Sequence, residues 1–296
     1  MRSSEPELSL EPPTPVGPAG IVGVAEAWLA PDAATIGAAS IPLLVLLWAI
    51  LIPPLRPAVL AFVVAGFLFQ RWRAAPATWA WAASLPLATI ITWSLLPAPR
   101  GLPGAASCAD LLSAPMLWRG AELLLVLVVV AAVARAMEAA RTDLPLARPD
   151  RWLVGLAAVA GFAIAPAALL LGEQAARPFF GSVHLQIGLA GAILPALVFG
   201  VANATLEETV YRGVLLGWTE RYLGTAGAIL VQAAAFGLAH TGSDFIASPL
   251  PVLTMMFVMG VIAGLIVKRT GSLAVPIIIH AAFDIPLYYS LACRLS

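Results

Sequence analysis

Residues 203–240 read NATLEETVYRGVLLGWTERYLGTAGAILVQAAAFGLAH, with two glutamates near the beginning and a histidine at the end. Glu207 precedes Leu223 by 16 residues, and His240 follows it by 17. If Arg221–Gly224 forms the turn of a helical hairpin, the two side chains return to the same depth, because every helix rises by the same distance per residue. The stretch therefore predicts two packed helices that bring an acid and an imidazole together.

The composition of the whole chain is typical of a membrane protein. Of 296 residues, 61% are hydrophobic and 11% are charged, against about 25% charged in soluble domains. So few polar side chains cannot cover a surface in water, which excludes a water-soluble enzyme and a disordered chain. The 16 basic and 16 acidic residues give no net charge, so no nucleic-acid partner is expected. Cys108 and Cys293 lack the spacing of a disulfide framework or a metal site. We expect an all-α polytopic membrane protein that is in contact with membrane lipid.

Apolar segments long enough to cross a bilayer, about 20 residues each, follow one another along the chain. Uncharged runs occupy residues 33–55, 57–70, 74–99, 152–172, 178–206, 222–243 and 245–267. Two further spans contain charges, namely 117–134 with Arg119 and Glu122, and 272–293 with Asp284. We predict eight or nine transmembrane helices.

We expect three parts: a flexible tail (1–30), N-terminal transmembrane helices of unassigned role (31–150) and a catalytic transmembrane domain (151–296). The last part holds all three histidines and most of the charge within apolar segments, so the chemistry is expected there.

Basic residues in short loops indicate which end of the helices faces the cytoplasm. They gather in the 71–76 and 135–151 connections, with a third cluster at Lys268 and Arg269. One helix over 184–221 would be about 57 Å long, too long for a single span. Pro195, Gly200 and Asn203 each offer a place to kink it. The sequence leaves open whether the third cluster shares the side of the first two.

Glu207, Glu208 and Arg212 form the first charged group within an apolar region. Adjacent residues point about 100° apart on a helix, so the two glutamates serve different faces. Glu208 and Arg212 are four residues apart and can pair, which leaves Glu207 free as a catalytic acid or base. A solvated helix end is the alternative interpretation of this short motif.

Two histidines lie on later apolar segments. FGLAH (236–240) places Phe236 and His240 on one helix face, and HAAFD (280–284) does the same for His280 and Asp284. An isolated histidine is often only a packing residue, but two titratable groups within one span indicate function. Turns near 221–224 and 268–271 would bring these groups to Glu207. Such a cluster can bind Zn²⁺ and activate water, or activate water through Glu207 alone.

EETVYR, FGLAH and HAAFD, in this order on successive apolar segments, resemble the EExxxR, FxxxH and HxxxN/D motifs of the CPBP family of CAAX and bacteriocin-processing proteases. The resemblance covers roughly residues 150–293. It implies an intramembrane endopeptidase, a metalloprotease similar to CAAX prenyl proteases, that cleaves a peptide or lipidated protein. Glu207 would be the general base, and Glu208 and Arg212 a supporting pair. His240 and His280 would hold the water, directly or through a divalent metal.

The family often has Asn at the position of Asp284, where an amide could stabilise the oxyanion. An ionised Asp cannot donate, so the departure favours orientation of His280 or ligation of a metal, zinc above all, by His240, His280 and Asp284, with Glu207 as a possible fourth ligand. Two other functions remain open: a proton- or cation-coupled transporter, and a catalytically silent immunity or scaffold protein. Arg and Ala richness suggests a GC-rich genome, so a bacterial plasma membrane is the expected location.

Overall fold

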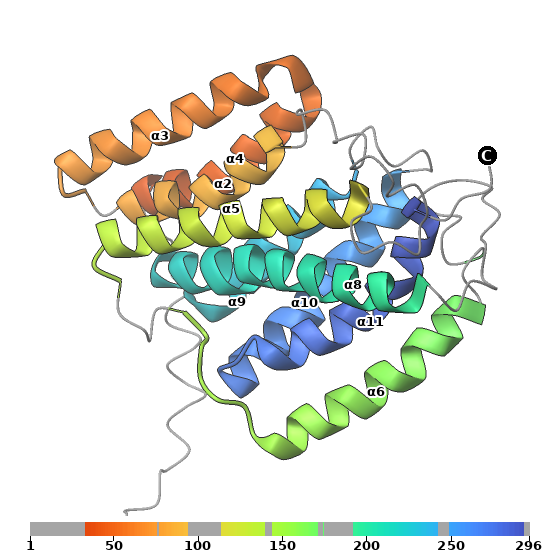
Figure 1. The fold of residues 1–296 in the computed structure, drawn as a ribbon. Helices are drawn as coiled ribbons and strands as arrows, with labels where there is room; N and C mark the ends of the chain where they lie inside the picture. The colour runs from red at the N-terminus through yellow and green to blue at the C-terminus, as the bar shows by residue number, and fades with distance from the viewer. Residues whose placement is uncertain are drawn as a thin grey trace, which may run out of the picture.

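The computed structural model describes residues 33–75, 77–93, 114–139, 144–170, 174, 192–241 and 249–292. The expected tail over residues 1–30 lies outside them. The regular structure in the described part is helical, in agreement with the predicted fold class. The elements are α2 (Ala33–Leu51), η2 (Pro53–Leu55), α3 (Arg56–Trp72), α4 (Thr78–Trp93), α5 (Ala114–Ala136), α6 (Arg151–Leu170), α8 (Ile193–Glu208), the π-helix η5 (Thr209–Leu216), α9 (Gly217–Ala239), α10 (Pro249–Thr270) and α11 (Ala274–Ala292). Figure 1 shows them side by side, with α3 at one edge and α6 at the other.

Several helices are long and apolar enough to cross a membrane, which supports an integral membrane protein. Within the described ranges these are Pro53–Trp72, Met116–Ala136, Ile193–Ala239 and Leu250–Thr270. Ser40–Leu51, Arg151–Ile164 and Ala274–Tyr289 are apolar but shorter. The described residues thus contain four long candidate spans, and the predicted count of eight or nine is not confirmed.

The predicted hairpin after Glu207 is confirmed. Gly224 has φ 63° and ψ 174°, so the helical conformation is interrupted there, and glycine adopts positive φ without steric cost. The Tyr211 and Phe236 ring centroids, on opposite sides of this turn, are 5.1 Å apart. The chain therefore reverses at Gly224, while Pro195, Gly200 and Asn203 all lie within the regular helix α8.

The second predicted turn follows α10 and contacts the basic 135–151 connection of the first half. Gly271 has φ 64°, and its carbonyl accepts a hydrogen bond from Ala147 N–H at 3.0 Å. An isolated antiparallel bridge pairs Leu146 with Ser272. Lys268 and Arg269 therefore lie at the same end as the 135–151 connection. The third basic cluster therefore shares the side of the 135–151 connection, which the sequence left open. The positive-inside rule predicts that this basic end faces the cytoplasm.

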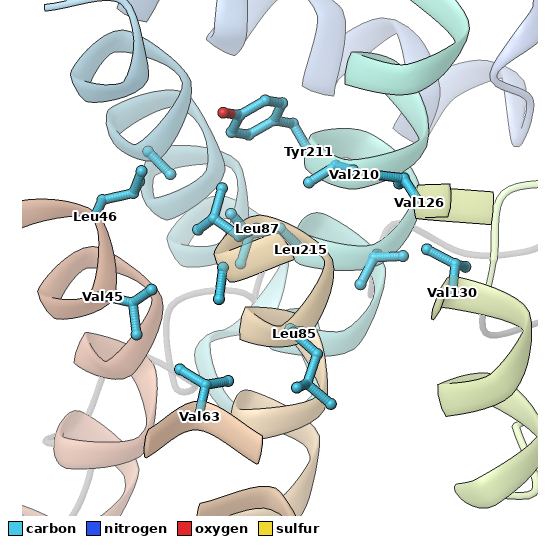
Figure 2. Packing of buried hydrophobic residues seen from close by; sticks show 14 of the residues in the cluster. Val45, Leu46, Val63, Leu85, Leu87, Val126, Val130, Val210, Tyr211 and Leu215 are labelled. Carbon is cyan, nitrogen blue, oxygen red and sulfur yellow. The ribbon is translucent and has the colours of Figure 1, made fainter. Parts of the chain in front are cut away.

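The hydrophobic core joins the N-terminal helices to the segment that carries the glutamates. One cluster contains residues from α2, α3, α4 and α5 together with Val210, Tyr211 and Leu215 of η5. Figure 2 shows side chains of this cluster converging from these elements. Trp218, which is fully buried, packs edge-on against Trp79 of α4 with ring centroids 5.6 Å apart. The N-terminal helices thus support the backbone that positions Glu207 and Glu208.

Close packing between α8 and α11 depends on Gly200. A Cβ atom at this position would lie 2.7 Å from the backbone oxygen of Ala281. We expect Gly200→Ala to displace α11 and to lower the free energy of unfolding by about 1–3 kcal/mol. It should also lower any activity, because α11 carries His280 and Asp284. Thermal unfolding in detergent would measure the loss. Gly155→Ala in α6 is the control, since a Cβ there meets no atom within 4 Å; equal effects of the two substitutions would contradict the prediction.

Candidate active site

The charged side chains expected at the site, Glu207, Glu208, Arg212, His240, His280 and Asp284, form one cluster. Glu208 and Arg212 are its most buried pair. Arg212 Nη1 lies 3.0 Å from Glu208 Oε1, and both side chains are at most 2% exposed. The pair spans the junction of α8 with the π-helix η5, a helix type that often occurs at functional sites. The guanidinium of Arg212 also lies 4.3 Å above the Phe236 ring. The pairing expected from the i,i+4 spacing is therefore present, and it is not a solvated helix end.

His280 comes from α11, which packs against α8. Its Nδ1 lies 2.8 Å from Glu208 Oε1. A carboxylate accepts, so Nδ1 donates this hydrogen bond. The Nε2 atom of the same ring lies 3.6 Å from Glu207 Oε2 and 3.7 Å from Asp284 Oδ1. Glu208 thus fixes the orientation of the His280 ring.

His240 terminates α9. Its Nδ1 lies 2.7 Å from the Phe236 carbonyl oxygen, so this nitrogen also donates. Its Nε2 lies 3.9 Å from Glu207 Oε2. The Phe236 ring packs against both imidazoles, with centroids 4.6 Å from His240 and 6.0 Å from His280. Both rings therefore present Nε2 to the same carboxylate oxygen.

Asn203 links the two remaining acids of the cluster. Its side-chain Nδ2 donates to Asp284 Oδ2 at 2.9 Å and to Glu207 Oε1 at 3.2 Å. The sequence indicates Asn203 only as a possible kink in this helix. The available signal was its position four residues before Glu207, which places both on one helix face.

The cluster has a buried side and a more accessible side. Glu207, His240 and His280 retain 14%, 17% and 12% of their side-chain exposure, respectively. Among the described residues, the buried atom Glu207 Oε2 has no hydrogen-bond partner. Its distances of 3.6 and 3.9 Å to the two Nε2 atoms exceed a direct hydrogen bond.

A second charged pair lies beside the cluster, on α5. Arg119 Nη1 binds Glu122 Oε2, and the guanidinium of Arg119 lies 5.9 Å from the Phe199 ring of α8. Both charges are visible in the sequence within an apolar run, but the sequence indicates no role for them. Only the packing of α5 against α8 brings them to the site.

The described residues fit the expected metal only in part. The Nδ1 atom of each histidine contacts a protein oxygen, an arrangement that directs Nε2 of a neutral ring toward a metal. No group of three His, Cys, Asp or Glu side chains in the described ranges is arranged to hold one ion. The ligand set His240, His280 and Asp284 stays a prediction.

The fold and the site define a class of protein. It is an all-helical integral membrane protein with a buried Glu–Arg pair and two oriented histidines. Residues 178–286 match the family model described as type II CAAX prenyl endopeptidase Rce1-like. This part of the chain is therefore an Rce1-like domain of the CPBP family, and the resemblance drawn from the three motifs is confirmed.

One curated protein is similar in sequence, and its description states no function. An uncharacterized 24.3 kDa protein of Escherichia coli is 30% identical over 135 residues. The match covers 44% of this chain and 58% of the length of that protein. No solved structure matches the chain.

Proposed function

We propose that the protein is an intramembrane endopeptidase that hydrolyses a peptide bond of a membrane-associated or lipidated protein. One observation carries the proposal. Glu207 Oε2 has no hydrogen-bond partner among the described residues, and it faces the Nε2 atoms of His240 and His280 at 3.9 and 3.6 Å. The Rce1-like domain over residues 178–286 supports the same reaction class.

Glu207 acts as the general base in this proposal. A water between the three groups donates one hydrogen to Glu207 Oε2 and the other to an imidazole Nε2, which leaves an oxygen lone pair directed at the substrate carbonyl. Glu207 removes the proton as the oxygen attacks, and later returns it to the leaving amine. The Asn203 amide holds the other oxygen of Glu207, so that Oε2 keeps its direction.

Glu208 and Arg212 have a supporting role. Glu208 accepts from His280 Nδ1 and pairs with Arg212, so it holds the imidazole without contacting substrate. Its burial at 1% exposure fits this role. A base and a structural acid are thus distinguished by their surroundings.

Substrate trapping tests the proposal. The Glu207→Gln variant, expressed in native membranes, should retain a bound protein that mass spectrometry identifies and that the wild-type enzyme cleaves. Cleavage in liposomes should proceed without an ion gradient, unlike the flux of a transporter. Absence of cleavage of every trapped protein by the wild type would refute the proposal.

Replacement of Asp284 distinguishes activation of water by Glu207 from metal ligation. We expect Asp284→Asn to retain activity within about tenfold of the wild type, because the new amide oxygen can still accept from Asn203 and its nitrogen can donate to His280 Nε2. Peptidase assays with and without chelator measure both effects. A loss of about 10–100-fold or more, together with chelator inhibition that added Zn²⁺ reverses, would instead establish Asp284 as a metal ligand.

A further inference from the structure

The Arg119–Glu122 pair lies outside residues 178–286, on helix α5, whose other charged residue, Arg135, is in the last turn. Met116–Ala136 is one of the candidate membrane spans. Glu122 is 3% exposed, and the Arg119 side chain is about three-quarters buried, with 25% exposure. Ionisable residues at membrane depth are expensive and usually face a cavity or a functional group. The pair therefore requires an explanation beyond helix stability.

Arg119 lies at the depth of the cluster. It precedes Arg135, at the basic end of α5, by 16 residues, which corresponds to about 24 Å along a helix. Glu207 precedes the turn at Gly224 by 17 residues, a similar rise. Phe199, the ring beneath the Arg119 guanidinium, is one helical turn before Asn203. Glu207 and Asp284 both lie within electrostatic range of Arg119.

Among the described charged residues near the site, Arg119 is the accessible cation. Four acids lie in the cluster or beside it, namely Glu122, Glu207, Glu208 and Asp284. Arg212 is 1% exposed and bound to Glu208, so it cannot reach a ligand. Arg119 is partly exposed, and its buried Nε has no hydrogen-bond partner among the described residues. A guanidinium has five N–H donors in a planar fork, which matches the two oxygens of a carboxylate.

We propose that Arg119, held in place by Glu122, binds the C-terminal carboxylate of the peptide substrate. The inference rests on the proposed function, since a peptidase of the CAAX type cleaves close to the end of a chain. A terminal carboxylate that enters an apolar region next to several acids needs a cation, and Arg119 supplies it. The substrate site therefore includes α5 as well as the Rce1-like domain.

Paired peptides test the inference by binding alone. The probe is a farnesylated peptide that ends in Cys-Val-Leu-Ser, prepared as the free acid and as the C-terminal amide. Binding to the purified, non-cleaving Glu207→Gln protein is measured by fluorescence anisotropy. We expect the acid to bind about 10–100-fold more tightly than the amide, because hydrogen bonds to a charged group typically contribute an affinity difference of this size. Adding Arg119→Gln should abolish this preference. Adding Arg269→Gln, at the exposed basic end, should preserve it.

A second variant covers the case in which Arg119→Gln fails to fold with Glu122 left unpaired. The double replacement Arg119→Met and Glu122→Gln removes both charges and should also abolish the preference. Equal binding of acid and amide, no binding of either, or a preference that survives in both variants would overturn the inference. Cleavage of the free acid by the wild type is measured separately. A preference for the acid without cleavage would refute the proposed function and leave this inference standing.

Discussion

Replacing Glu207 by glutamine is expected to slow peptide cleavage by about 10²–10⁴-fold, the usual effect of losing a general base. The amide cannot take the proton of the attacking water. Its oxygen can still accept from Asn203 Nδ2, which now holds Glu207 Oε1 at 3.2 Å. The fold should therefore persist, and the thermal unfolding temperature in detergent should stay close to that of the wild type.

The matched control is Glu220→Gln. Glu220 is also a glutamate within the helical hairpin, but it pairs with Lys268 at 2.8 Å at the basic end, away from the histidines. This replacement should leave cleavage unchanged and alter the free energy of unfolding by about 1 kcal/mol or less. If Glu207→Gln cleaves within tenfold of the wild type, Glu207 is not the base.

Arg212→Ala is expected to destabilise the protein by about 3–5 kcal/mol, because it leaves Glu208 charged, buried and without its cation. The same change removes the guanidinium that lies 4.3 Å above the Phe236 ring. Since Glu208 also holds His280, activity should fall together with stability. Thermal unfolding in detergent and peptidase assays on the same preparation measure the two losses.

A paired replacement separates burial of a charge from catalysis. Glu208→Gln combined with Arg212→Met removes both charges and should recover much of the lost stability, and the glutamine oxygen can still accept from His280 Nδ1. Loss of activity in Arg212→Ala with an unchanged unfolding curve would contradict the structural role. Arg212 would then act directly on substrate.

The local spacing of residues was sufficient to predict much of the site. A distance of four residues places Glu208 beside Arg212, and the two are paired. The positions of Glu207 and His240, nearly symmetric about Leu223, predicted a reversal that the positive φ of Gly224 confirms. Both inferences rest on the constant rise and rotation of a helix, which do not depend on the rest of the molecule.

The number of membrane spans was less predictable. Apolar composition identifies segments that can enter a bilayer, but helix ends also depend on turns and on neighbouring helices. The run over residues 178–206, for example, contributes α8, which is described from Ile193 onward. The same helix continues through the π-helix to the turn at Gly224. Hydropathy therefore established the class of protein without establishing the helix count.

By itself the sequence determined the class of protein, the family of residues 178–286 and the acids and histidines of the candidate site, because composition, motifs and helical periodicity are local properties. Only the tertiary structure decided which groups face one another. Asn203 meets Asp284 across 81 residues, and Arg119 comes to α8 from a helix that carries none of the family motifs. The basic segments at 147 and 271 meet through a backbone hydrogen bond. These contacts depend on which helices pack together, and that is set by side-chain packing throughout the core rather than by the spacing within any one segment.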